Sequence, residues 1–163
     1  MYRVANMKQR RFIHITGIVQ GVGFRPFVYQ LAIRHQLAGS VINDSEGVKV
    51  DVQGDVEQLD EFISELTLQA PPLSRIDQVA VWPRPLHHVT SFAIEQSKGR
   101  SLTSVCLSPD QGICEDCRAD IADPTSRYYR YPFTNCTHCG PRYTIVEALP
   151  YDRAVTGMRT FSL

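Results

Sequence analysis

The distribution of cysteine constrains this chain more than any other feature of its sequence. All five cysteines of the 163 residues lie from Cys106 onward, and four of them form two Cys-x-x-Cys pairs, Cys114 with Cys117 and Cys136 with Cys139. Each pair can turn tightly enough to place two thiolates on one metal, and the segment between the pairs can bring the second opposite the first. The spacing predicts one Zn²⁺ per chain, and a structural one, because four protein ligands leave no open position.

Two alternatives exist for these cysteines: disulfides, or a redox-active Cys-x-x-Cys motif. Residues 1–14 carry charge but lack the apolar segment of a secretory signal, so we expect a cytoplasmic location, where disulfides are rare. The presence of two pairs also argues against a single redox motif. Cys106 lies outside the spacing and is expected to be a free thiol. The cysteine-rich region has little apolar periodicity, and we expect it to fold only when metal binds.

The part of the chain before the cysteines has the pattern of a small α+β domain. Strand-like segments of alternating or β-branched residues occur at 11–16, 40–44, 47–53, 76–82 and 91–96, and helix-like apolar spacing follows Pro26 and runs through 56–66. The resulting order, β-α-β-β-α-β with a short extra strand, predicts a ferredoxin-like fold. In this fold two helices cover one face of an antiparallel sheet.

Charge and hydropathy argue against membrane and nucleic-acid functions. No apolar run approaches the roughly 20 residues that a membrane span needs, and 17 basic residues balance 17 acidic ones. The segment Arg127–Asn135 interleaves arginine with aromatic residues that could stack on bases. However, four thiolates and one Zn²⁺ would turn the formal +1 of residues 97–163 into about −1. We therefore expect this segment to serve packing or protein contacts, with no nucleic acid bound.

A glycine-rich segment, GIVQGVGFRPFV (17–28), joins the first predicted strand to the first predicted helix. Such a loop directs its backbone N–H groups and the positive end of the helix at one spot, and glycine lets the backbone close around a ligand. Arg25 adds a planar, permanently charged fork that can hold two phosphate oxygens. The alternative is a tight turn with a surface arginine, which the GVG sequence by itself would favour.

The string GIVQGVGFR, placed between a strand and a helix in this order of elements, resembles the signature of the acylphosphatase family. The resemblance implies that Asn43 orients the attacking water and that an acyl phosphate is held by a set of loop residues: Gln20, Gly21, Val22, Gly23, Phe24 and Arg25. Judged on its own, Asn43 before Asp-Ser-Glu-Gly would be ordinary hairpin-turn chemistry. No general acid is needed, because an acyl phosphate expels a carboxylate, which is a weak base.

The acylphosphatase-like part and the cysteine-rich part together resemble the N-terminal portion of the HypF family of carbamoyltransferases. The resemblance is carried by Asp110–Ile145, which is similar to the first zinc finger of that family, and by ALPYDR (148–153) after it. It implies carbamoyl phosphate as the substrate, a HypE-like protein as a partner, and a role in the maturation of nickel–iron hydrogenases. The chain would contribute hydrolysis of the acyl phosphate.

These inferences divide the chain into four parts. We expect an acylphosphatase-like domain at 10–96, a linker at 97–112, a four-cysteine zinc-finger region at 113–153 and a truncated tail at 154–163. Because the chain ends at Leu163, about where a second finger would begin, the later transfer domains are expected to be absent. The alternative function is a non-catalytic module that binds phosphate and uses its zinc finger to contact a protein.

Overall fold

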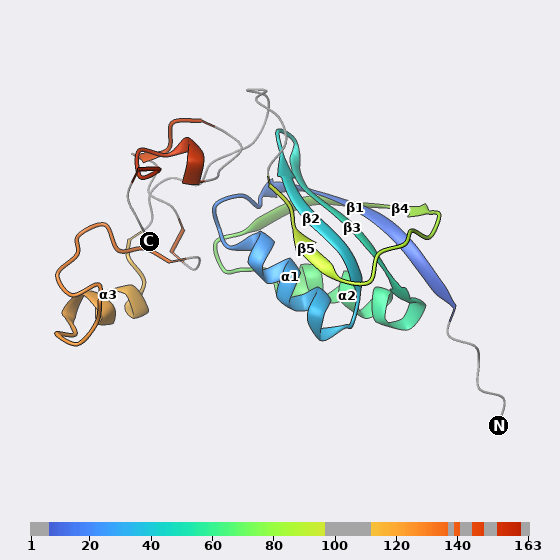
Figure 1. The fold of residues 1–163 in the computed structure, drawn as a ribbon, viewed down its shortest axis with the longest axis horizontal. Coiled ribbons are helices and arrows are strands. Elements are labelled where there is room, and N and C mark those ends of the chain that lie inside the picture. Colours follow the sequence, from blue (N-terminus) through green and yellow to red (C-terminus); the bar gives the residue numbers. More distant parts are fainter. Residues whose placement is uncertain (1–6, 97–111, 137–138, 141–144, 149–152, 161–163) are drawn as a thin grey trace.

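The computed structural model describes residues 7–96, 112–136, 139–140, 145–148 and 153–160. The elements of the N-terminal domain follow in chain order: β1 (Lys8–Ile18), α1 (Phe24–Arg34), β2 (Ala38–Asp44), β3 (Gly47–Asp55), α2 (Val56–Leu68), β4 (Arg75–Arg84) and β5 (Phe92–Ile94). This order confirms the predicted ferredoxin-like fold with its short extra strand (Figure 1).

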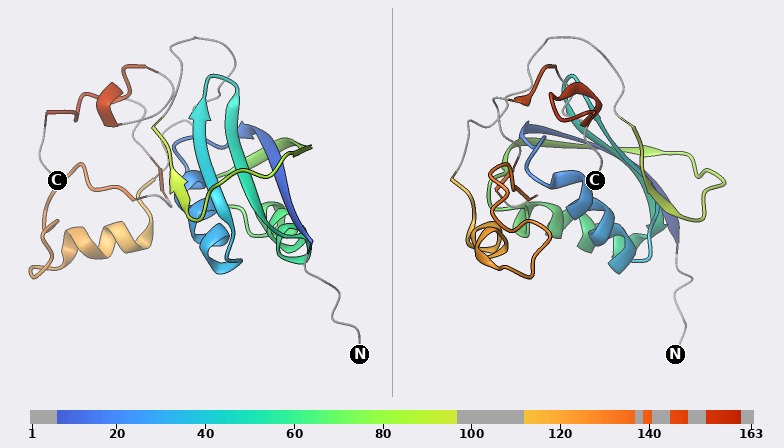
Figure 2. Two further views of the ribbon diagram at one scale, coloured as in Figure 1. Left: turned by 45° about the vertical axis from the view of Figure 1, so that its right-hand side comes forward. Right: turned by 60° about the vertical axis from the view of Figure 1, so that its left-hand side comes forward.

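The five strands form one sheet in the order β4-β1-β3-β2-β5. Neighbouring strands are antiparallel except β5, which pairs in parallel with Gly39–Val41 of β2. Both helices lie on the same face of the sheet, and the views in Figures 1 and 2 agree on this arrangement. Because β5 covers only the first part of β2, the end of β2 at Asn43 and Asp44 extends beyond the edge strand.

The core lies between this sheet and the two helices. On β3 the valines alternate with polar residues as predicted, and Val48, Val50 and Val52 are all fully buried. Other elements add buried apolar side chains, including Ile13 and Ile15 on β1, Val28 and Leu31 on α1, and Leu59, Phe62 and Leu66 on α2. Burial of these side chains is the main stabilisation of the domain.

The cysteine-rich region contributes one short helix, α3 (Glu115–Ala122), and a 3₁₀ turn, η2 (Arg153–Val155). Thr156 is buried and forms an isolated antiparallel bridge with Val146. Apart from Gly112, the predicted linker at 97–112 lies outside the described residues, as does Cys106. Within the described ranges, no helix has both the length and the apolar character needed to cross a bilayer.

A pair of leucine substitutions on α2 tests the core assignment. Leu66 is fully buried, whereas Leu68 is 79% exposed at the end of the same helix. We expect Leu66→Ala to lower the free energy of unfolding by about 2–5 kcal/mol through lost burial and the cavity it leaves. Leu68→Ala should change it by less than about 0.5 kcal/mol. Trp82 on β4 is the single tryptophan of the chain, so urea denaturation followed by its fluorescence measures both effects. Equal losses in the two variants would contradict the assignment.

Candidate functional site

The loop between β1 and α1 is held by apolar side chains that point into the core. Val19, Val22 and Phe24 are each 1% exposed. Gly21 and Gly23 have φ of 70° and 77°, a left-handed conformation that glycine adopts without steric cost. Gly23 is the N-terminal cap of α1, so the loop ends at the positive end of the helix dipole. A loop in this position can bind an anion.

Gln20 fixes this loop to the hairpin that carries Asn43. Its side chain is buried, and its Nε2 donates to the backbone oxygens of Asp44 at 2.6 Å and of Gly47 at 2.9 Å. The Asp44 carboxylate in turn accepts from the backbone N–H groups of Glu46 and Gly47 and closes the hairpin turn. Gln20 is predicted to bind phosphate, but its carboxamide donates to the hairpin backbone and so has a structural role.

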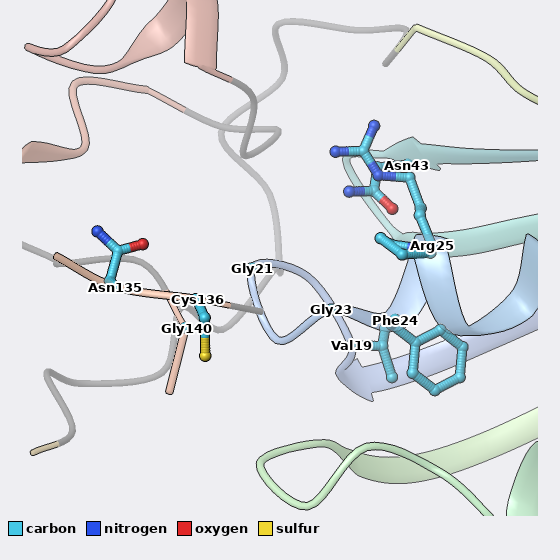
Figure 3. A pocket seen from close by; sticks show the side chains of 10 residues that line it. Val19, Gly21, Gly23, Phe24, Arg25, Asn43, Asn135, Cys136 and Gly140 are labelled. Carbon is cyan, nitrogen blue, oxygen red and sulfur yellow. The ribbon is translucent and has the colours of Figure 1, made fainter. Parts of the chain in front are cut away.

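A cavity of about 300 Å³ lies at the junction of the loop, α1 and β2. Four of the six residues predicted to bind phosphate line it, and so does Asn43; the four are Gly21, Gly23, Phe24 and Arg25. Gln20 and Val22 do not line it, and their side chains are buried elsewhere. Figure 3 shows the side chains of Arg25 and Asn43 next to each other on one side of the loop. The structure therefore brings together both residues predicted to be catalytic.

The electrostatics of the cavity suit an anion and a hydrogen-bond donor. Among the described residues that line it, Arg25 alone carries a positive charge. Asn43 is 1% exposed, and its Oδ1 accepts no hydrogen bond from the described part of the chain. A buried acceptor left unsatisfied costs about 1–3 kcal/mol, so such an atom in a pocket indicates a bound donor such as water.

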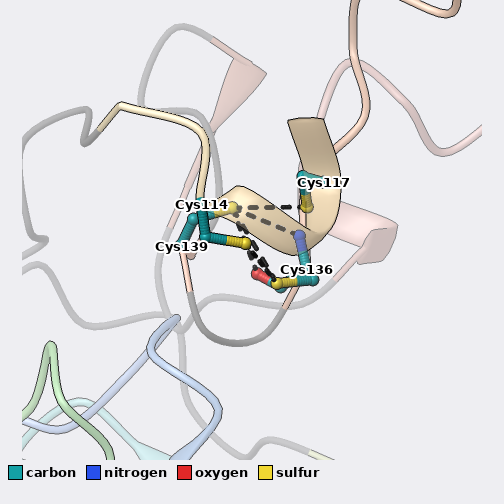
Figure 4. Close-up of side chains that lie close together, drawn as sticks. All are labelled: Cys114, Cys117, Cys136 and Cys139. Atoms are coloured by element: carbon teal, nitrogen blue, oxygen red, sulfur yellow. Dashed lines mark hydrogen bonds between the residues drawn. The ribbon is translucent and has the colours of Figure 1, made fainter. Parts of the chain in front are cut away.

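The four cysteines predicted to bind metal converge at one point (Figure 4). Their sulfur atoms are separated by 3.5 Å between Cys114 and Cys136, 3.8 Å between Cys117 and Cys139, and 4.0 Å between Cys136 and Cys139. A tetrahedral metal with metal–sulfur bonds of about 2.3 Å requires sulfur–sulfur distances of about 3.8 Å. A disulfide would bring two sulfurs to about 2.05 Å. The geometry therefore fits one tetrahedral metal ion.

The surroundings of the cluster act differently on its two buried thiols. Burial raises the pKa of Cys117, and hydrogen bonds with the neighbouring thiols raise it further. Burial opposes ionisation of Cys139 as well, but hydrogen bonds from Cys114 and Cys136 outweigh it and lower the pKa of this thiol. Four thiolates at these distances repel one another, and a divalent cation compensates for that repulsion.

The second cysteine pair also forms part of the cavity wall beside the glycine-rich loop. Asn135, Cys136 and Gly140 line the same cavity as Arg25 and Asn43. Gly140 is buried, and a Cβ at its position would lie 3.0 Å from the backbone oxygen of Gly21. The spacing of the cysteines does not predict these three residues as part of the cavity. The glycine directly after a Cys-x-x-Cys pair is the only signal for this contact in the sequence.

Comparisons with known proteins assign both parts of the chain. Residues 11–94 match the acylphosphatase family, and residues 113–146 match the HypF finger. Carbamoyltransferase HypF2 of Cupriavidus necator is 47% identical over 152 residues, which cover 91% of this chain and 19% of that protein. The acylphosphatase of Leuconostoc mesenteroides is 39% identical over 83 residues, which cover 50% of this chain and 92% of that protein.

Solved structures agree with these relationships. The crystal structure of full-length HypF in the phosphate- and nucleotide-bound form matches with a TM-score of 0.88 and 45% identity, covering 96% of this chain and 21% of that one. This chain thus spans about a fifth of the length of the carbamoyltransferases it matches. The chain belongs to the acylphosphatase family and, with its HypF finger, corresponds to the N-terminal region of the HypF carbamoyltransferases.

Proposed function

We propose that this chain hydrolyses acyl phosphates, with carbamoyl phosphate as the substrate, within a HypF-type carbamoyltransferase that acts in nickel–iron hydrogenase maturation. The observation that carries the proposal is the unsatisfied Oδ1 of buried Asn43 in a cavity where Arg25 supplies the positive charge. The names of the relatives support it, because carbamoyl phosphate is itself an acyl phosphate and the chain is similar to both acylphosphatases and carbamoyltransferases.

The phosphate group binds to the loop and the start of α1. Backbone N–H groups between Gly21 and Arg25 donate to its oxygens, and the helix dipole adds positive potential at the same place. The guanidinium of Arg25 holds two oxygens at once and stabilises the charge that spreads over the phosphoryl oxygens in the transition state. The buried side chains of Val19, Val22 and Phe24 fix the loop backbone, so little reorganisation of its N–H donors would accompany the reaction.

Asn43 positions the water that attacks phosphorus. Its Oδ1 accepts a hydrogen bond from the water and fixes the water in line with the bond to the leaving group. The oxygen of the water forms the new bond to phosphorus, the bond from phosphorus to the acyl oxygen breaks, and the proton that the water loses passes to an oxygen of the product phosphate. The leaving carboxylate, here carbamate, departs without needing a proton. This chemistry is consistent with a cavity whose described lining contains no carboxylate or histidine.

The four cysteines hold one structural Zn²⁺, since thiolate donors in a closed tetrahedron favour zinc and leave no position for a substrate. The metal stabilises the finger and takes no part in the hydrolysis. Transfer of the carbamoyl group to a HypE-like partner is proposed for the whole carbamoyltransferase, and this chain spans 19% of the length of HypF2. A non-catalytic module would instead bind phosphate without turnover.

Substitution of Arg25 tests the phosphate-binding role. We expect Arg25→Ala to lower kcat/KM for carbamoyl phosphate by about 10²–10³-fold, because a preorganised donor to the transition state is lost. Arg25→Lys should retain more of kcat/KM than Arg25→Ala but less than the native protein, since an ammonium group cannot hold two phosphate oxygens at once as a guanidinium does. Phosphate release measured against a buffer blank gives the rates. Arg34→Ala on the same helix is the control, because Arg34 pairs with Glu65 at the surface, and it should retain native activity. Native protein that releases no more phosphate than buffer would contradict catalysis.

Asn43→Ala separates positioning of water from binding of phosphate. We expect kcat to fall by about 10²-fold while inorganic phosphate inhibits the variant as strongly as the native protein, because the loop and Arg25 remain in place. The inhibition constant of inorganic phosphate and kcat are the two measurements, and urea denaturation verifies that the variant is folded. An inhibition constant that rises along with the loss of kcat would assign Asn43 to phosphate binding instead.

Metal content tests the finger. We expect one zinc per chain in reduced, dialysed native protein, measured by elemental analysis, and almost none in Cys117→Ser, which removes a buried ligand. Cys106→Ser is the matched control, because Cys106 lies outside the spacing of the pairs, and it should keep the full zinc content. A native stoichiometry near zero would overturn the zinc assignment.

A further inference from the structure

We propose that Asn135, which directly precedes Cys136 of the second cysteine pair, is a specificity-determining residue that recognises the amino group of the carbamoyl moiety. The inference rests on the proposed hydrolysis of acyl phosphates and extends it to the choice of acyl group. Its starting point is the cavity wall: Asn135, Cys136 and Gly140 line the cavity that Arg25 and Asn43 also line. The cysteine-rich module therefore contributes residues to the proposed substrate site.

The direction of the acyl group follows from the chemistry of the displacement. Attack on phosphorus is in line, so the leaving group lies on the side of phosphorus opposite the attacking water. Asn43, which holds the water, lies with Arg25 on one side of the loop, and Asn135 and Cys136 lie on the other side (Figure 3). With the phosphate over the loop, the acyl group therefore points toward the cysteine pair.

Asn135 presents a hydrogen-bond acceptor at that end of the cavity. Its Nδ2 donates to the backbone oxygen of Phe133 at 3.1 Å, which fixes the orientation of the carboxamide. A carbonyl oxygen can only accept, so this bond assigns Nδ2 to the Phe133 side of the carboxamide and leaves Oδ1 on the other side, where it can accept from a ligand. The amino group of carbamoyl phosphate can donate to Oδ1. The methyl group of acetyl phosphate, which has a similar size, cannot.

Gly140 sets how close the acceptor comes to the phosphate. It has φ of 73°, and a Cβ there would approach the backbone oxygen of Gly21 to 3.0 Å. Its N–H also donates to the backbone oxygen of Cys136 at 2.9 Å, which closes the turn of the pair. Any side chain at position 140 would strain this turn and push it away from the loop, and Asn135 would move with it.

The experiment compares kcat/KM for carbamoyl phosphate and acetyl phosphate, measured as phosphate release by the full chain. We expect the native protein to prefer carbamoyl phosphate. Asn135→Ala should reduce the preference by about fivefold to tenfold, the size of one neutral hydrogen bond, through a lower value for carbamoyl phosphate and an unchanged value for acetyl phosphate. Asp120→Ala, an exposed position on α3 outside the cavity lining, is the control and should keep the native preference.

A second pair of variants tests the same inference without altering Asn135. Gly140→Ala should also lower the preference, whereas Gly157→Ala should not, because a Cβ at Gly157 meets its nearest atom at an ordinary 3.8 Å. Zinc content measured on both variants verifies that the cysteine cluster is intact. A preference that is the same in native protein, Asn135→Ala and Gly140→Ala overturns the inference.

Failure of the inference and failure of the proposed function are distinguishable. Arg25→Ala should lower the rates for both substrates together, and if the native chain hydrolyses neither, the proposed hydrolysis is wrong. In that case calorimetry tests the inference. It measures the affinities of the native protein and of Asn135→Ala for carbamoyl phosphate and for acetyl phosphate. A loss of affinity confined to carbamoyl phosphate supports it, and equal affinities in the two proteins contradict it.

Discussion

Two hydrogen bonds from the buried carboxamide of Gln20 hold the site together. They join the glycine-rich loop to the backbone of the β2–β3 turn, at Asp44 and Gly47. The loop leads into Arg25 at the start of α1, and Asn43 lies at the end of β2 beside the turn, so the two groups with proposed chemical roles are fixed relative to each other. Since a misplacement of about 1 Å in a catalytic group can cost about 10²-fold in rate, this buried link is a condition for the chemistry.

The pattern of the sequence predicts much of this arrangement because local rules govern it. Alternating valines on β3 place one face in the core, and the glycine-rich string predicts the loop between β1 and α1. The spacing of the cysteines predicts their convergence for the same reason, since each pair is a local turn. The role of the Gln20 side chain could not be predicted this way. A glutamine in a loop can face a ligand or the protein interior, and only its partners, 24 and 27 residues away, decide between them.

The contact between the two modules is the other feature that local patterns do not predict. Nothing in the periodicity of either part indicates that Gly140 packs against Gly21, because the contact involves one backbone oxygen and an absent side chain. A glycine after a cysteine pair is common for reasons of turn geometry alone. Asn135 is exposed and directly precedes a metal ligand, so by itself it suggests no role. Its position becomes informative only when the fold places the second cysteine pair against the loop.

The two modules obtain their stability from different sources, so the two sides of the cavity between them are stabilised in different ways. The N-terminal domain has a continuous apolar core, whereas the described part of the cysteine-rich module buries mainly Cys117, Cys139, Thr134 and Thr156. A module with so little apolar burial depends on its metal ligands for a fixed shape. The fold itself therefore forms the loop side of the cavity, whereas we expect the Asn135 side to form once four thiolates are fixed around a metal. The proposed phosphate binding and the proposed choice of acyl group thus fall on parts of the chain that become ordered by separate means.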